Sequence, residues 1–427
     1  FIITLLSCGP RGYINQKTIE YGQDLKIDYP SEDFIINAHL TRIRFGVIGK
    51  GDSLKEPRIT VTETDYKRIA AINDLISYTD QIVLSNQTTL DSFGVRYLGR
   101  YSQKYFPDLV TLPIQQENIF HSDYKSTYYK VPFYTTGVQA DISYTQTTLD
   151  AKYFTIIPFP NSYITENREV FIEIPAWLDV EIQEKNFQGY EIIKTEIRDV
   201  YAKSRKKPKA QKIKESRNEK TGKDSKPEVN TEMPGAIKGY SYKVKKLPYW
   251  RHEESSPGFQ KNIPHLLVLV KSYKSVKKTN ENLLSNTADL YKWYKSLVDA
   301  VEEDSAEIKK ITDKIVINCK TEREKMDSIF YWIQDNIRYL AFEEGLAGFQ
   351  PDAAIKVYNN KFGDCKGMAN LAKNMLKSQN IDARLTWIGT RDIKYDYSIP
   401  SLAVDNHMIT TVFLKDGSKF FIDPTET

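Results

Sequence analysis

A cysteine, a histidine and an aspartate in the last part of the chain have the types and the order of a nucleophilic catalytic group. Cys365 follows Gly363 and Asp364, and the apolar residues after it recur at helical spacing. Because Asp364 is a favourable N-cap residue, the pattern predicts that Cys365 begins a helix. The free N–H groups and the positive dipole end at this position favour a thiolate over a thiol. Cys365 is therefore the candidate nucleophile.

The histidine and the aspartate lie on a predicted β-hairpin. One alternating run begins at His407, the next ends at Asp423, and residues 415–417 (Lys-Asp-Gly) separate the two runs. A type I turn followed by a left-handed glycine makes a loop of this length, and in the resulting register Ile409 faces Asp423. His407 and Asp423 then share one sheet face as diagonal neighbours, within reach of an imidazole and a carboxylate. A loop shorter by one residue would shift the register and place the two side chains on opposite faces.

Helices are predicted before the cysteine. Residues 305–319 place isoleucines and Cys319 on one stripe, so Cys319 is expected to be a packed core thiol. A second helix is expected after Thr321, because Thr321 and Glu324 match the capping-box pattern. Residues 345–360 are predicted to form a loop. Both helices direct an apolar stripe inward, as core helices do.

Two segments resemble the core of the transglutaminase-like superfamily of papain-type thiol enzymes, namely GDCKGMANLAKNMLKSQNIDARLTWIG and NHMITTVFLKDGSKFFIDPT. They share a Cys at a helix start, followed by His and Asp on successive strands, and the resemblance covers residues 302–427. It implies that Cys365 is the nucleophile and that His407 is the general base and then the acid. It also implies that Asp423 orients and charges the imidazole.

The reaction class that follows is acyl transfer through a thioester. The backbone N–H of Cys365 is expected to hold part of the oxyanion, and Asn360 and Gln350 are the candidates for the second donor. With water as the acceptor, the enzyme would be a peptidase or amidase. With a lysine amine, it would be a cross-linking transglutaminase. The sequence leaves both acceptors open.

Strand-like sequence dominates the region before these helices. Residues 13–201 consist of short runs rich in Val, Ile, Thr, Tyr and Phe between Gly, Pro, Asn and Asp, and they predict one or two β-sandwiches. A helix-permissive stretch at 65–78 interrupts them, and strand-like runs resume at 240–244 and 265–273. More weakly, residues 134–273 resemble the uncharacterised sandwich domain that precedes such cores in bacterial envelope proteins.

A basic insertion, residues 203–226, interrupts the β-rich region. Its eleven Lys or Arg and three acidic residues give a net charge of +8, with almost no apolar side chain. Such a composition cannot offset the entropy of ordering, so an exposed and mobile segment is expected. The insertion could attract anionic headgroups or an acidic partner, or it could be a solvated loop without a partner.

The first residues, FIITLLSC, resemble the end of a secretory signal that carries a bacterial lipobox. The resemblance implies that Cys8 is lipidated and that residues 1–12 are a signal remnant and tether. It also implies a lipoprotein anchored in the outer membrane and facing the periplasm. The alternative is a short buried strand with an incidental cysteine. Because the chain begins with Phe1 and stops soon after Asp423, we expect further sequence at both ends.

Composition argues against several other classes. The chain has 427 residues, 40% of them hydrophobic and 12% aromatic, and its net charge of +4 gives no nucleic-acid signal. No apolar run reaches the ~18 residues of a membrane span, and three cysteines cannot form a disulfide framework. The histidines His39, His121, His252 and His265 show no zinc-ligand spacing, and no phosphate-binding glycine motif is present. No cofactor and no metal are therefore expected.

The sequence thus predicts an α+β protein, with a β-sandwich region at 13–276 and a papain-like, transglutaminase-like core at 277–427. As an enzyme it would act on protein or peptide amides in the periplasm, with envelope proteins as further partners. The alternative is a non-catalytic scaffold or accessory lipoprotein subunit of an outer-membrane complex, which keeps the fold for its shape. That alternative predicts a blocked groove over Cys365 or a partner surface on the sandwich.

Overall fold

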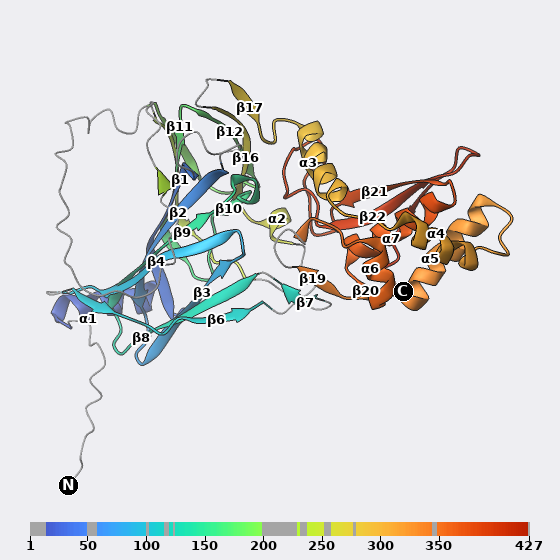
Figure 1. The fold of residues 1–427 in the computed structure, drawn as a ribbon. Coiled ribbons are helices and arrows are strands. Elements are labelled where there is room, and N and C mark those ends of the chain that lie inside the picture. The colour runs from blue at the N-terminus through green and yellow to red at the C-terminus, as the bar shows by residue number, and fades with distance from the viewer. Residues whose placement is uncertain are drawn as a thin grey trace, which may run out of the picture.

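The computed structural model describes residues 14–48, 58–99, 102–114, 119–122, 124–198, 229–230, 237–251, 258–275, 279–343 and 348–425. A β-rich part and a mixed part of helices and strands lie side by side (Figure 1). Cys8 with the segment 1–12 and the basic insertion 203–226 lie outside the described residues, so the expectations for both remain predictions.

One large sheet forms the centre of the β-rich part. Among the described residues it has nine strands, in the order β13 (Ile193–Ile197), β15 (Ile237–Leu247), β11 (Thr165–Pro175), β1 (Phe34–Ile48), β2 (Arg58–Ala71), β9 (Gln139–Thr148), β4 (Thr88–Tyr97) and β5 (Gln103–Tyr105), with β14 (Val229–Asn230) paired to β1. Strands β1 and β11 are parallel, and the other neighbours are antiparallel. The 3-10 turn η2 (Ala151–Tyr153) follows β9.

Two smaller sheets cover one face of the large sheet. The first contains β3 (Ile76–Leu84), β8 (Lys125–Phe133) and β6 (Val110–Pro113), and the second contains β10 (Ile156–Pro158), β16 (His265–Lys274) and β12 (Leu178–Lys185), with β17 (Asn280–Asn282) on β16. Strand β1 contributes Ile36 to a core with Phe133 under the first sheet, and Ile43 to a core with Val268 under the second. This layered arrangement confirms the predicted β-sandwich region.

Buried polar groups lie on the same face, between the two cores. His39 Nε2 is hydrogen-bonded to Asp65, and His39 Nδ1 accepts from Asn161 Nδ2 at 2.8 Å. Thr41 Oγ1 donates to Asp65 at 2.9 Å. Burial and the Arg168 guanidinium lower the pKa of His39 to about 4. The ring is therefore neutral, which agrees with an Nδ1 atom that accepts a hydrogen bond.

Two expectations for the β-rich part are wrong. Residues 16–28, inside the range expected to be strand-like, form helix α1 (Gln16–Asp28), which Asn15 caps by accepting from Thr18 N. Residues 65–78, expected to be helix-permissive, form the end of β2, a turn and the start of β3. Isoleucines spaced by three fit either structure, and pairing with β1 and β9 decides for the strand.

The second part surrounds one central helix. Its elements are α3 (Thr287–Asp299), α4 (Ser305–Ile315), α5 (Glu322–Asn336), α6 (Ala354–Asn360), α7 (Cys365–Ser378), and an antiparallel sheet in the order β21 (Asp382–Ile388), β22 (His407–Phe413) and β23 (Lys419–Ile422). Leu371 and Met375 of α7 are fully buried in a core that α4, α5 and this sheet complete. Strand β18 (Arg338–Tyr339) runs parallel to β20 (Phe362–Gly363), which leads directly into α7.

The local predictions for this part are mostly confirmed. Thr321 and Glu324 form the expected capping box at the start of α5. Cys319 packs against the core as expected, but it lies beyond the end of α4, with Sγ 3.2 Å from Ser328 Oγ. The predicted loop 345–360 is wrong in its second half, because residues from Ala354 onward form α6.

The two parts are in contact through a fourth core. Leu267 of β16 packs with Tyr294 of α3 and with Tyr395, from the loop between β21 and β22. A short helix, α2 (Phe259–Asn262), precedes β16, and β7 (Ile119–Ser122) pairs in parallel with β19 (Ala341–Glu343). The β-rich part therefore touches the loop that leads to His407.

Candidate active site

Cys365 is the first residue of α7, as predicted. The side chain of Asp364 caps the helix by accepting from Gly367 N at 2.8 Å. The glycine before the cap leaves room for α6, because a Cβ at Gly363 would lie in tight contact, 3.0 Å from Val357 Cγ1. Cys365 is 6% exposed. Its side chain thus lies at the positive end of a buried helix.

A buried lysine follows the cysteine and was not predicted from the sequence. Lys366 is 2% exposed, and its ammonium pairs with the Asp364 carboxylate. A buried charge is stable only when it is paired, so the ion pair fixes the N-cap carboxylate in place. A lysine near a helix start normally points into solvent, and nothing in the local sequence signals otherwise.

A second set of polar residues connects α7 to the loop before α6 by hydrogen bonds. Asn370, fully buried on α7, donates to the Asp352 carbonyl oxygen at 2.9 Å and to the Glu303 carboxylate. Glu303 also accepts from Ala354 N at 3.0 Å, so it caps α6 from a distant part of the chain. These residues position the helix that carries Cys365, and sequence reasoning missed them because their partners are far apart in the chain.

The hairpin register agrees with the prediction. Leu414 N donates to Ser418 O at 2.9 Å, and Gly417 has φ +88°, as a left-handed loop residue requires. Thr410 is paired with Ile422, and continuing this register places Ile409 opposite Asp423. His407 and Asp423 are thereby brought together, with His407 Nε2 2.7 Å from Asp423 Oδ2.

Cys365 lies close enough to the imidazole to affect its protonation. Asp423 and then Cys365 raise the pKa of His407 to about 10. Burial alone would raise the pKa of Asp423, but hydrogen bonds from His407 and Thr425 hold it below its usual range. The three predicted residues therefore lie together around a positively charged imidazole.

The segment before His407 makes hydrogen bonds with several other parts of the chain. Asn406 Oδ1 accepts from Thr390 N at 2.9 Å. Tyr294 OH donates to Asp405 at 2.7 Å, and burial raises the pKa of Asp405 to about 7. The loop is also tied to the β-rich part, because Tyr395 OH is 2.6 Å from His265 Nε2. The position of His407 thus depends on contacts with α3 and β16.

Of the two candidates for the second oxyanion donor, one makes a hydrogen bond elsewhere and the other is exposed. Gln350 Nε2 donates to Leu297 O at 3.1 Å, so this amide is engaged elsewhere. Asn360 is exposed at the end of α6. The backbone N–H of Cys365 remains the donor that the helix start provides.

The described part of the chain shows few features of a metal site or of a membrane-spanning helix. In the described part of the chain, no group of three or more His, Cys, Asp or Glu side chains is arranged to hold a metal ion. His39 and His265 are in buried hydrogen bonds, whereas the side chains of His121 and His252 lie outside the described residues. Within the same described residues, none of the helices combines the length and apolar character needed to cross a bilayer.

Residues 309–424 match the model of the transglutaminase-like superfamily. A solved structure described as a "putative protease" from Parabacteroides distasonis is 13% identical, with a TM-score of 0.57, over 92% of this chain and 67% of that chain. One described as a "putative cysteine protease" from Cytophaga hutchinsonii is 9% identical over 91% of this chain and 79% of that chain, with a TM-score of only 0.24. A search of curated proteins found no match.

The first of these structures shares the fold at an identity too low to transfer a function. The family match begins within α4 and covers α5 to α7 and the sheet that holds His407. The β-rich part precedes it in an α+β chain. Residues 309–424 of this chain therefore form a domain of the transglutaminase-like superfamily.

Proposed function

We propose that the protein is a cysteine-dependent acyl-transfer enzyme that acts on protein or peptide amides. The observation that supports this most is the position of the His407 imidazole, which is hydrogen-bonded to Asp423 and close enough to Cys365 for the thiol to help raise its pKa. In this position an imidazolium can balance the charge of a thiolate and carry a proton to a leaving amine.

The proposed reaction has two steps. The Cys365 thiolate attacks the amide carbonyl carbon, and the backbone N–H of Cys365 donates to the resulting oxyanion. The C–N bond breaks as His407 gives its proton to the leaving nitrogen, which leaves a thioester on Cys365. The neutral imidazole then takes a proton from the acceptor as the acceptor attacks the thioester, and the thiolate is restored.

The acceptor is either water or an amine. With water, the products are a carboxylic acid and free enzyme, so the enzyme is a peptidase or amidase. With a lysine amine, the product is a new amide bond. Both outcomes use the same group of three residues, and the test below separates them.

We also propose that the protein is a lipoprotein of the bacterial envelope that faces the periplasm. The support is the sequence that ends at Cys8, together with the weaker resemblance of the β-rich part to envelope proteins. A scaffold role without catalysis remains the second candidate. The observation that favours it is the low exposure of Cys365, 6%, because a scaffold does not need a thiol that a substrate can reach.

Two probes test the enzymatic proposal. p-Nitrophenyl acetate reports thioester formation without demanding a particular peptide, and α-casein with dansylcadaverine distinguishes cleavage from amine attachment. We expect an acetyl group on Cys365 and one of the two casein products. Cys365→Ala and His407→Ala should lower both activities at least about a thousandfold.

Cys319→Ala is the matched control, because it removes a half-buried thiol outside the site, and it should retain full activity. An unmodified Cys365 together with unchanged casein in the wild type would reject the enzymatic proposal. The scaffold role would then be preferred.

A further inference from the structure

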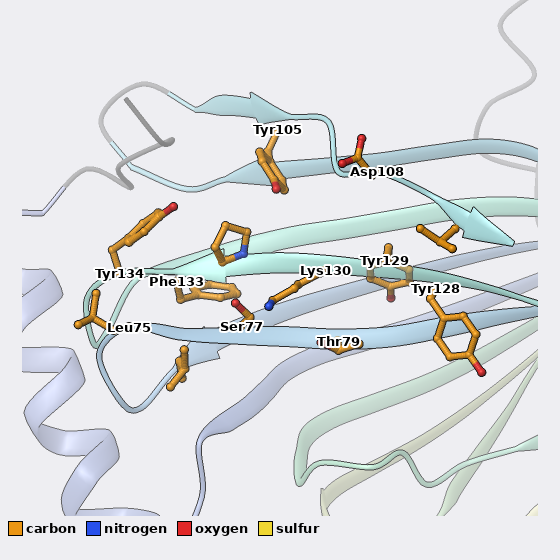
Figure 2. A pocket seen from close by; sticks show the side chains of 13 residues that line it. Leu75, Ser77, Thr79, Tyr105, Asp108, Tyr128, Tyr129, Lys130, Phe133 and Tyr134 are labelled. Atoms are coloured by element: carbon orange, nitrogen blue, oxygen red, sulfur yellow. The ribbon is translucent and has the colours of Figure 1, made fainter. Parts of the chain in front are cut away.

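A pocket of about 530 Å³ lies on the β-rich part, in a region that the proposed reaction does not use (Figure 2). Strands β3 and β8 form one side, and Tyr105 and Asp108, on the segment from β5 to β6, lie across from them. This volume is within the range of sites for small molecules. The pocket is therefore large enough for a ligand of several rings.

Aromatic and flat side chains form much of the lining. Tyr128 and Tyr134 remain 40% and 39% exposed, although burying a tyrosine ring is favourable. Burial raises the pKa of Tyr105, and the charges of the nearby Tyr134 and Asp108 raise it further. Tyrosine rings offer rigid apolar surface at low cost in conformational entropy, and each carries a hydroxyl group. The pocket thus presents flat surfaces with hydrogen-bonding edges.

Polar groups without a partner lie beside these rings. Thr79 of β3 faces Lys130 of β8 across the sheet, and Ser77 is two residues further along the strand. Among the described residues, Asp108, Lys130, Ser77 and Thr79 have no ion pair or hydrogen bond through their side chains. All four line the pocket. A bound molecule would therefore find two hydroxyls, a carboxylate and an ammonium group free to bind it.

We propose that this pocket binds a short neutral oligosaccharide. The C–H faces of sugar rings pack on flat aromatic surfaces, and the hydroxyl edges both donate and accept hydrogen bonds. An anionic ligand would be repelled by Asp108, and a cationic one by Lys130. Hydroxyl groups satisfy both residues, because they donate to the carboxylate and accept from the ammonium. This inference does not rest on the proposed reaction at Cys365.

A proline-rich peptide is the other ligand class that tyrosine-lined grooves take. It fits this pocket less well, because such a peptide has few donors and would leave Asp108 and Lys130 unpaired unless it carried both charges at matching positions. The experiment therefore includes a peptide as a competing outcome.

Isothermal titration of the full chain with maltotetraose, cellotetraose and tetra-N-acetylchitotetraose tests the proposal. We expect at least one of them to bind with a dissociation constant on the order of 1 mM or tighter. Binding should change little between low and high salt, since the ligand is neutral. Tyr128→Ala and Tyr134→Ala should each weaken binding tenfold or more, and both side chains are exposed enough for the fold to tolerate the change.

Tyr331→Ala is the matched control, because this tyrosine is 60% exposed on α5 and away from the pocket lining, and it should bind as the wild type does. Cys365→Ser should also bind normally, which separates this inference from the catalytic one. The proposal is overturned if none of the three sugars binds, or if Tyr128→Ala binds as well as the wild type. Binding of a decaproline peptide that depends on Tyr128, without sugar binding, would assign the pocket to peptides instead.

Discussion

Replacing Asp423 by asparagine should lower the pKa of His407 while the fold is kept. Asparagine has the shape of aspartate and can still accept from Thr425, but it removes the negative charge beside His407. The imidazolium then loses its largest stabilising partner. The expected result is an imidazole that gives up its proton at a lower pH than in the wild type.

The size of the expected effect follows from the pKa of the His407 imidazole. Its neighbours raise the pKa of His407 from 6.5 to about 10, which corresponds to about 5 kcal/mol. Asp423 is the largest contributor, so its removal costs the imidazolium about half of this or more, a factor of about 50. Because the folded pKa is raised, the group stabilises the fold fully below pH 6.5, and this contribution is lost as the pH rises through about 10.

The assay is an NMR pH titration of the His407 ring protons, which are assigned by their loss in His407→Ala. We expect the acid dissociation constant of His407 to rise about 50-fold in Asp423→Asn, so that the imidazole stays protonated at pH 6 and becomes mostly neutral at pH 9. Asp382→Asn is the matched control, because this aspartate is exposed on the neighbouring strand β21.

An unchanged pKa of His407 would refute the reasoning, because the imidazolium would then not depend on Asp423. Thermal unfolding of both proteins shows whether a lower pKa comes from a disturbed fold. Iodoacetamide alkylation of Cys365 in His407→Ala at pH 6 provides a second test, since this variant removes the cation without changing the carboxylate. If the alkylation rate equals that of the wild type, the thiol is not activated by its neighbours.

Three further predictions concern other parts of the chain. The pKa of His39 is lowered from 6.5 to about 4, so between these pH values the unfolded chain binds one more proton than the folded chain. Urea unfolding should therefore show that the free energy of unfolding falls by about 2 kcal/mol from pH 7 to pH 5. His39→Gln should flatten this part of the pH profile. Tyr395→Phe removes the hydrogen bond to buried His265 and should cost about 1–2 kcal/mol in the same experiment, with a control at an exposed tyrosine unchanged. Mass spectrometry of the native N-terminal peptide should find lipid on Cys8, and an unmodified peptide that begins at Phe1 would contradict the lipobox interpretation.

Features that depend on a few neighbouring residues could be predicted from the sequence. The Asp364 cap, the capping box of Thr321 and Glu324, and the loop that ends at Gly417 are each determined by side chains within four positions. The loop length alone fixes the register that brings His407 to Asp423. Local sequence rules are therefore enough to predict that Cys365 begins a helix and that His407 lies beside Asp423, whereas the meeting of Cys365 with these two residues followed from the family resemblance.

Features that depend on distant partners could not be predicted. The buried pair of Lys366 and Asp364 requires that the helix start be covered by other elements, and the cap that Glu303 gives to α6 comes from a residue about 50 positions away. Residues 65–78 fit a helix or a strand by spacing, and only their neighbours in the sheet decide. Likewise, the tyrosine pocket combines β3 and β8 with the segment that connects β5 of the large sheet to β6, and local sequence does not show that these meet.

The β-rich part bears on the chemistry although it contributes none of the three candidate residues. The loop that ends at His407 packs through Tyr395 on β16, and its Asp405 is hydrogen-bonded to Tyr294 of α3. Both β16 and α3 lie before residue 309, where the family match begins. A catalytic imidazole must be held within a fraction of an ångström of its working position by supporting contacts. The unit that positions His407 is therefore larger than the transglutaminase-like domain, and the sheet containing β16 belongs to it.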